Sequence, residues 1–444
     1  EVLDAEGRLH RDFAEERLRF FVGRSEMLDR IAGYLQDSRC RCLGIAGGGG
    51  TGKSALIARA VEAAQSAYPN AAIVYRFIGA TPASSDGRSL LESLCHEISR
   101  RYGAKTTSLP IDYRDLVPEL GKRMALATAE KPLILFLDSL DQLSPSQGAR
   151  SLVWLPNELP EQVSVVISTR EEDTWKNLQS KSPRQAALSG LSRVDGEALL
   201  ALWLADIHRT LQPSQRADVL ASFEACQGNP LYLKLAFEEA RLWSSFQPQE
   251  RLAASLGGLI QHNMFERLEK EGSHGDALVS HALGYLAASR YGLAEDELVD
   301  LLSRDPQVYG WFYRKSYHLP ADLIQAAVQY RKSGAAGNDE QQAAIAWLDA
   351  IRAQPDQVSA FLGQVLPRAD GPRLPVVLWS RLSFDLAPYL GERALDGSPL
   401  LNFFHRELGE VAREVFLADG NQKTYHARLA DYFRFKADPA ASRT

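Results

Sequence analysis

The chain has 444 residues, more than one hydrophobic core normally serves, so several packed units are expected. Its composition is that of a globular protein, and no apolar run approaches the roughly 18 residues that a membrane-spanning helix needs. The net charge of −6 disfavours nucleic acid as a partner, and the four cysteines show no disulfide or zinc spacing. We therefore expect a soluble, cytoplasmic protein with no membrane partner. Because the sequence begins at Glu1 without a methionine and ends in the small polar residues DPAASRT, we also expect that it is excised from a longer chain.

The first half of the chain alternates apolar strands with helices. A charged lead-in, residues 1–20, is followed by the segment FFVGRSE and a helix. Strands are then expected near residues 41–46, 71–79, 132–138, 163–170 and 185–191. Strands that alternate with helices predict a parallel sheet with right-handed crossovers.

After residue 191 strand signals almost vanish, and the rest of the sequence predicts helices. We expect a small helical domain at 192–270, after an α/β domain at 21–191. A winged-helix-like domain is expected at 271–444, because residues 285–302 have a helix-turn-helix pattern. A helical insertion is expected within it, at about 305–375.

A glycine-rich loop stands between the first strand and the next helix. Residues 47–54 have the sequence GGGGTGKS, a pattern whose backbone amides surround phosphate oxygens. The lysine would reach the β- and γ-phosphates and the serine would bind Mg²⁺, so ATP or ADP with Mg²⁺ is the expected cofactor. Residues 21–191 are therefore expected to be a nucleotide-binding domain. A glycine-rich linker that happens to end in GKS is the alternative. The nucleotide-binding candidates here are Gly47, Gly48, Gly49, Gly50, Thr51, Gly52, Lys53, Ser54 and Ala55.

Two carboxylates are found at the end of the apolar run PLILFLD and shortly after it. Asp138 ends that strand and is the expected acid on the Mg²⁺ side, with Ser54 as the second metal ligand. Asp141 could orient or deprotonate an attacking water, or instead cap a helix. Ser139 stands where many related ATPases have a glutamate, so slow hydrolysis is expected.

Arg170 ends the next strand and is a candidate for sensing the γ-phosphate and stabilising its charge. An exposed arginine in a surface ion pair is the alternative.

These motifs, in this order, resemble the STAND branch of AAA-type P-loop ATPases, and the NACHT group most closely. The resemblance spans about residues 20–435 and implies an α/β P-loop sheet of the AAA-type (ASCE) class sandwiched by helices, then a helical domain and a winged-helix-like domain. The segment FVGRSE is similar to a family loop over the adenine, which implies that Val22, Gly23 and Arg24 bind the base. The family's DGxDE motif is replaced here by DSLDQ, which puts turnover more in doubt than binding.

Two further residues take their expected roles from this resemblance. The turn GNPL, residues 228–231, is similar to the family's GxP motif, which implies that Pro230 packs on adenine; by itself it predicts only a turn. The segment FFHRELGE, residues 403–410, resembles the winged-helix motif FxHxxFxE, which implies that His405 contacts the β-phosphate of ADP. A histidine packed on an apolar helix face is the alternative.

Two functions are compatible with these motifs. The first is a regulated switch, closed with ADP and forming homo-oligomers with ATP, in immune or antiphage-type signalling. The resemblance implies sensor repeats and an effector domain elsewhere in the parent chain. The second is a cycling motor ATPase, or a STAND transcription regulator, acting on nucleic acid. The acidic segment AEDELVDLL disfavours this second function, since a recognition helix needs Lys and Arg.

Overall fold

The computed structural model describes residues 2–37, 42–81, 83–105, 109–246, 251–305, 307–308, 311–312, 374–395, 398–418 and 420–437. The chain forms two compact units, Glu1–Leu259 and Ile260–Thr444. Nearly all of the insertion expected at 305–375 lies outside the described residues, and the domain boundaries expected at 191 and 270 stay predictions. Within the described residues, no helix is both long and apolar enough to cross a bilayer.

The first unit contains a five-stranded parallel sheet with the strand order β2-β3-β4-β1-β5. Its strand β3 is buried along its whole length, as its continuous apolar sequence predicts. The last strand ends four residues earlier than expected. The strands are β1 (Leu43–Ala46), β2 (Ala72–Phe77), β3 (Leu133–Asp138), β4 (Val163–Thr169) and β5 (Arg184–Ala187).

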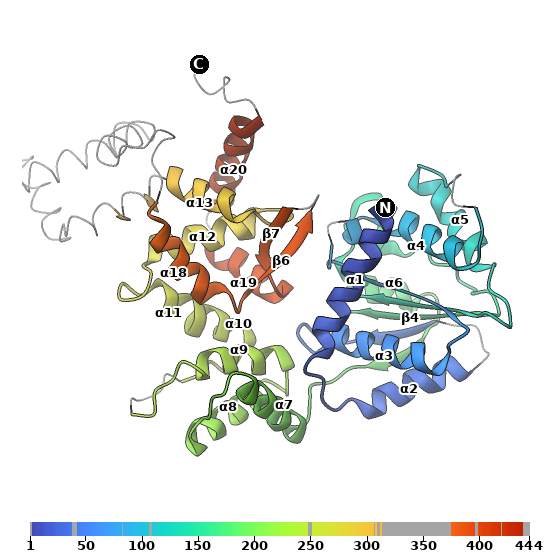
Figure 1. Ribbon diagram of the computed structural model, residues 1–444, viewed down its shortest axis with the longest axis horizontal. Coiled ribbons are helices and arrows are strands. Elements are labelled where there is room, and N and C mark those ends of the chain that lie inside the picture. Colours follow the sequence, from blue (N-terminus) through green and yellow to red (C-terminus); the bar gives the residue numbers. More distant parts are fainter. Residues whose placement is uncertain are drawn as a thin grey trace, which may run out of the picture. The chain divides into compact units, whose positions relative to one another are not determined.

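Helices cover both faces of this sheet (Figure 1). Alternate strand residues point to opposite faces, so Ile134 and Phe136 pack with α1–α3, whereas Leu133, Leu135 and Leu137 pack with α4–α6. These helices are α1 (Val2–Leu18), α2 (Ser25–Gln36), α3 (Lys53–Ala67), α4 (Gly87–Arg101), α5 (Tyr113–Met124) and α6 (Asp173–Gln179), with short 3₁₀ turns η1 (Ala83–Ser85), η2 (Leu140–Gln142) and η3 (Ser146–Ser151). The predicted α/β sandwich is confirmed.

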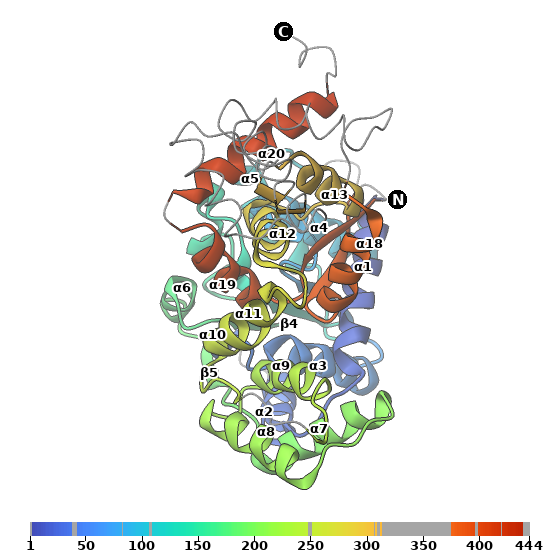
Figure 2. The same cartoon turned by 90° about the vertical axis from the view of Figure 1, so that its left-hand side faces the viewer.

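The first unit ends in a small group of helices (green in Figure 2). It buries Leu200 and Phe223, and Trp203 lies with its ring centroid 5.6 Å from that of Phe237. Its helices are α7 (Arg193–Asp206), α8 (Pro213–Ala225), α9 (Pro230–Ala240) and the short α10 (Leu256–Gly258).

The second unit is built around α12, which is apolar on nearly all sides and is therefore central. Tyr285 of this helix donates to the buried carboxylate of Asp305 at 2.7 Å, and Arg428 of α20 pairs with the same carboxylate. The helices are α11 (Glu266–Glu269), α12 (Asp276–Ala288), α13 (Glu295–Arg304), α18 (Val376–Leu386), α19 (Arg406–Phe416) and α20 (Asn421–Ala437), after the π-helical turn η4 (Leu259–Phe265).

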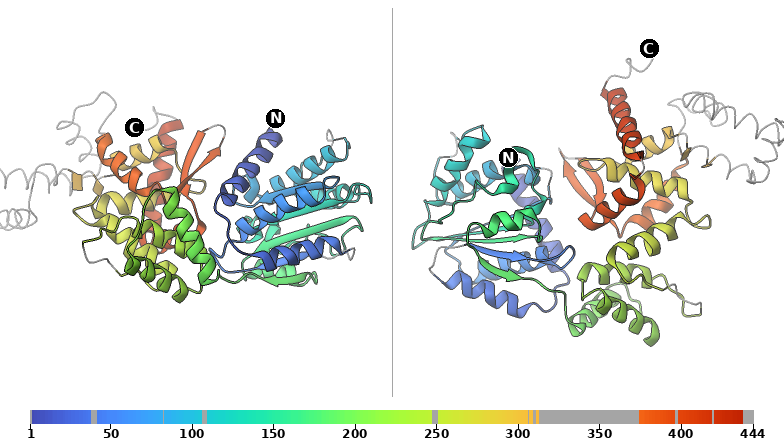
Figure 3. Two further views of the ribbon diagram at one scale, coloured as in Figure 1. Left: turned by 60° about the horizontal axis from the view of Figure 1, so that its bottom comes forward. Right: turned by 180° about the vertical axis from the view of Figure 1, so that it is seen from behind.

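The expectation that only helices follow residue 191 is wrong for this unit. An antiparallel hairpin, β6 (Leu390–Leu395) and β7 (Ser398–Phe403), appears as a pair of orange arrows in Figure 3. Leu401 of β7 also bridges Leu293, which precedes α13. Among the described elements, the helices α12, α13 and α18 followed by such a hairpin agree with the winged-helix-like fold expected here.

Candidate functional site

The glycine-rich loop connects β1 to α3, at the carboxyl edge of the sheet. Lys53 begins α3 and is only 8% exposed, and its ammonium donates to the carbonyl oxygens of Gly47 at 2.7 Å and Gly48 at 2.8 Å. The ammonium group of Lys53 is thus held inside the loop, and the glycines leave the loop backbone accessible because they have no side chains. This arrangement has the donors and the charge that bind phosphate at a helix N-terminus.

Asp138 lies beside this loop because β3 and β1 both pair with β4. Its Oδ2 accepts hydrogen bonds from Ser54 at 2.6 Å and Ser139 at 3.1 Å, and its Oδ1 accepts one from Ser168. Full burial raises the pKa of this carboxyl, while the three hydroxyl donors and Lys53 oppose the rise. A buried carboxylate next to a serine hydroxyl is the oxygen pair expected at a Mg²⁺ site.

Ser54 and Asp138 match the way in which proteins usually hold Mg²⁺ that is bound to phosphate. Among the described residues, no group of three or more His, Cys, Asp or Glu side chains could form a metal cage. Mg²⁺ at nucleotide sites usually takes one or two protein oxygens and completes its shell with phosphates and waters. Ser54 and Asp138 supply that smaller number of ligands.

Asp141 and Arg170, predicted separately, lie together at the end of β4. The Oδ1 atom of buried Asp141 accepts from the backbone nitrogen of Arg170 at 3.1 Å, and its Oδ2 lies 3.7 Å from Nε of the same arginine. Arg170 also lies 3.6 Å from Glu172. Ser139, not Asp141, is the N-terminal cap of η2, so the capping alternative for Asp141 is wrong. The side chain of Arg170 is only 14% exposed, which disfavours the surface-pair alternative.

The segment containing Val22 and Gly23 leads to Arg24, which contacts the phosphate loop. Arg24 donates to the carbonyl oxygen of Thr51 at 2.7 Å and to that of Ser189 at 2.6 Å. Its guanidinium therefore connects the lead-in segment, the loop and the chain after β5. Burial lowers the pKa of Arg24, and Asp195 opposes that effect, so the charge is retained at neutral pH. Contact with a base stays a prediction for Val22, Gly23 and Arg24.

The turn before α9 packs directly on the phosphate loop. Asn229 donates from Nδ2 to the carbonyl oxygen of Gly49 at 2.8 Å, while its Oδ1 accepts from the backbone nitrogens of Leu231 and Tyr232. Leu231 also donates from its backbone to Gly50 at 3.2 Å. Gly50 has φ +72°, and a Cβ there would lie 2.6 Å from that of Leu231.

Pro230 begins α9 and lies near the same loop. A Cβ built on Gly52 would lie 3.8 Å from Cγ of Pro230. Its predicted contact with adenine stays a prediction. Asn229 is a functional candidate that the sequence motifs did not single out. Asparagine is enriched at helix N-caps, which is a local signal in the sequence, but only the fold shows the contact with Gly49.

Two glycines bring the chain after β5 against the same turn. A Cβ on Gly190 would lie 1.9 Å from the carbonyl oxygen of Gln227, and one on Gly228 would lie 2.1 Å from that of Leu191. The backbone nitrogen of Leu191 donates to Gly228 at 2.7 Å. The two segments therefore touch through their backbones.

His405 belongs to the second unit, whereas the residues described above belong to the first. His405 caps α19, and its Nδ1 accepts from the backbone nitrogen of Glu407 at 3.2 Å. This hydrogen bond is compatible with the alternative of a packed, hydrogen-bonded histidine, and the predicted phosphate contact stays a prediction.

Comparison with known proteins agrees with this site. Residues 21–168 match the AAA ATPase domain family. The chain is 31% identical over 433 residues to human NACHT domain- and WD repeat-containing protein 1, covering 95% of the chain and 24% of that protein. It is 26% identical over 455 residues to human NACHT and WD repeat domain-containing protein 2, covering 96% of the chain and 22% of that protein. The chain thus spans about a quarter of these curated relatives.

Among solved structures, the chain is similar to a STAND protein with a tetratricopeptide repeat sensor from Pyrococcus horikoshii. The match has a TM-score of 0.43 and 16% identity, and covers 95% of this chain and 46% of that one.

The phosphate loop, Asp138 and the family match identify a P-loop NTPase of the AAA ATPase class. The similarity to the two human proteins extends over nearly the whole chain. The chain is a NACHT-type P-loop NTPase, as the sequence motifs predicted.

Proposed function

We propose that the chain is a regulatory switch that binds ATP or ADP with Mg²⁺ and transmits the state of this site to its helical segments. The contact that supports the proposal most directly is that between Asn229 and Gly49, because it joins the phosphate loop to the first turn of α9. A change in the carbonyl positions of this loop would alter a hydrogen bond that also belongs to a helix cap. Differential contacts of this kind are what a population shift requires.

The residues of the site have distinct proposed roles. Lys53 would exchange its two carbonyl partners for phosphate oxygens, since it already lies inside the loop. Ser54 and Asp138 would hold Mg²⁺, and Ser168 would keep the orientation of the carboxylate. Bound Mg²⁺ would supply charge neutralisation for the phosphates.

Hydrolysis by this site is proposed to be slow. Ser139 stands directly after Asp138, so no carboxylate occupies the position where many related ATPases have their base. Asp141 makes its contacts with the backbone and side chain of Arg170 at the end of β4. We assign Asp141 the positioning of Arg170 as well as its predicted role toward water. Arg170 retains its proposed role toward the γ-phosphate.

The relatives suggest that the switch is part of a larger protein. The two human proteins are described as containing WD repeats, and the archaeal one a tetratricopeptide repeat sensor. By analogy, we propose that sensor repeats and an effector domain belong to the parent polypeptide, and that ATP promotes homo-oligomers. Cytoplasmic immune or antiphage-type signalling is the setting we propose.

The experiment measures bound nucleotide and turnover together. The chain is purified without added nucleotide and denatured, and the released nucleotide is identified by ion-exchange chromatography. Near-stoichiometric ADP, retained in the exposed-lysine control Lys176→Ala and lost in Lys53→Ala, is expected. Loss in His405→Ala would support its predicted phosphate contact. Empty protein with rapid ATP turnover would refute the switch and favour the motor alternative.

A further inference from the structure

A second, strongly cationic pocket lies in the first unit, away from the phosphate loop. It has a volume of about 630 Å³, and its lining comes from α1, β2, α3 and α4. None of its lining residues belongs to the phosphate loop or to the pairs around Asp138 and Asp141. The strand involved, β2, is at the edge of the sheet farthest from β5.

The charges around this pocket are almost all of one sign. Its lining includes five arginines and one carboxylate, Glu97, a formal excess of four positive charges in a chain whose net charge is −6. Concave sites lined by one sign of charge concentrate the field and attract counter-ions. The cationic side chains are Arg8 and Arg11 of α1, Arg76 of β2, and Arg100 and Arg101 of α4, with His96 of α4 beside them.

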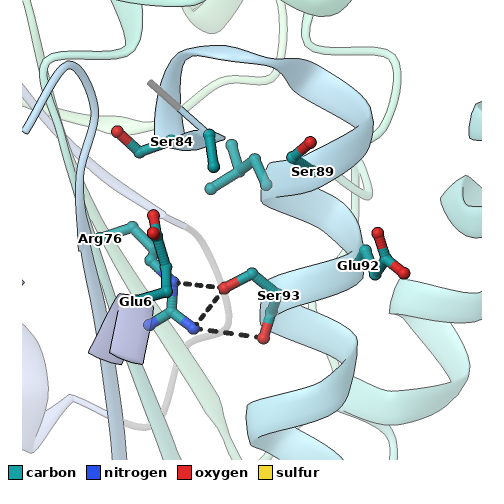
Figure 4. Close-up of a pocket in the computed structure, with 8 residues that line it drawn as sticks. Glu6, Arg76, Ser84, Ser89, Glu92 and Ser93 are labelled. Carbon is teal, nitrogen blue, oxygen red and sulfur yellow. Dashed lines mark hydrogen bonds between the residues drawn. The ribbon is translucent and has the colours of Figure 1, made fainter. Parts of the chain in front are cut away.

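The buried end of the pocket is formed by Arg76, which is held by several hydrogen bonds and an ion pair. Arg76 is only 3% exposed, and its guanidinium donates to Oγ of Ser93 at 2.7 and 2.9 Å and to the carbonyl oxygen of Ser93. Figure 4 shows these contacts in a view of a different pocket that Arg76 and Ser93 also line. Arg76 donates as well to the carbonyl oxygen of Tyr75. It also pairs with Glu97 at 2.7 Å, and Arg101 pairs with the same carboxylate at 3.3 Å. The attraction of both arginines holds the pKa of Glu97 below its usual value despite burial, so this acid stays ionised.

The outer arginines come from two helices. Arg8 and Arg11 are three residues apart on α1 and therefore lie on one face, while Arg100 belongs to the last turn of α4. Guanidinium groups bind phosphate oxygens in pairs, so several such groups around one space favour an anion with several phosphates.

We propose that this pocket binds a compact polyphosphorylated small molecule, which would join α1 to α4. The volume is within the range of about 300–1,000 Å³ that small-molecule sites occupy. A nucleic acid would need a continuous basic surface along several phosphates, whereas the lining here surrounds one half-open pocket. The proposal does not depend on the switch function.

The test uses inositol hexakisphosphate as the probe, with isothermal titration calorimetry at physiological salt. We expect one bound probe per chain, and affinity lower by about tenfold or more in the double variant Arg8→Gln/Arg11→Gln, because charge-assisted hydrogen bonds are lost. The matched control, Arg30→Gln/Arg114→Gln, removes two exposed arginines outside the pocket. It should bind as the parent does, and so should Lys53→Ala, since the phosphate loop is not involved.

Several results would overturn the proposal. Equal loss in the control pair, or many weakly bound probes per chain, would mean that only net charge matters. Equally strong displacement by a short DNA duplex would assign the surface to nucleic acid. Sedimentation with phosphatidylcholine vesicles carrying phosphatidylinositol bisphosphate, abolished by the α1 double variant, would assign it to a lipid headgroup rather than to a soluble ligand. Circular dichroism melting of each variant confirms that it is folded.

Discussion

Asn229 performs two tasks that one pair of substitutions can separate. Its Oδ1 caps α9 by accepting from Leu231 at 2.9 Å, and its Nδ2 donates to Gly49 in the phosphate loop at 2.8 Å. Alanine removes both interactions. Serine keeps a side-chain oxygen for the cap, but it is too short to reach Gly49.

The expected costs follow from these contacts. Loss of an N-cap costs about 0.5–2 kcal/mol and loss of a hydrogen bond about 0.5–1.5 kcal/mol. Asn229→Ala should therefore lower the free energy of unfolding by about 1–3.5 kcal/mol, and Asn229→Ser by only about 0.5–1.5 kcal/mol. For a unit of this size, each kcal/mol lowers Tm by about 2–4 °C.

The assay compares urea unfolding with the affinity for a fluorescent ADP analogue. We expect both variants to lose affinity to the same extent, because both lose the contact with Gly49, while only Asn229→Ala loses the cap. If Asn229→Ser bound nucleotide as tightly as the parent, the proposed coupling between the loop and α9 would be refuted. Equal stability of the two variants would refute the separate capping role.

Three further outcomes are expected. Ser54→Ala should weaken Mg²⁺-dependent ADP retention by about tenfold or more, measured by equilibrium dialysis, since it removes a metal ligand and one donor to Asp138. Gly50→Ala should lower Tm more than Gly103→Ala, because both glycines have positive φ but only a Cβ at Gly50 meets other atoms within 4 Å; equal shifts would contradict this. Burial lowers the pKa of His10, so the unfolded chain binds more protons below about pH 6.5 and the free energy of unfolding should fall there. His10→Gln should flatten that dependence in urea titrations from pH 7 to pH 5.5, and an unchanged slope would refute it.

The sequence was sufficient to predict the fold of the nucleotide-binding domain, because the sequence signals for its strands and its phosphate loop are local. The run LILFLD is typical of a strand buried on both faces. A glycine-rich loop that ends in GKS between a strand and a helix is compatible with few structures other than a phosphate-binding loop. The hairpin β6–β7 was missed, since Glu392 and Arg393 interrupt the apolar alternation that predicts a strand.

The long-range contacts of the site could not be predicted in the same way. Asn229 and Gly49 are 180 residues apart, and Asp141 and Arg170 come from separate loops. Each pair depends on how distant segments of the chain are brought together, which periodicity does not determine. The pocket at Arg76 is likewise assembled from α1, β2, α3 and α4.

The backbone contact between Gly190 and Gly228 has a consequence for how this chain tolerates variation. Both residues are in connecting segments, where substitutions are usually accepted. Here a single methyl group at either position would collide with a carbonyl oxygen about 2 Å away. In a library of all single substitutions, these two positions should therefore be as depleted as the buried centre of the sheet, although neither lies in a strand or a helix.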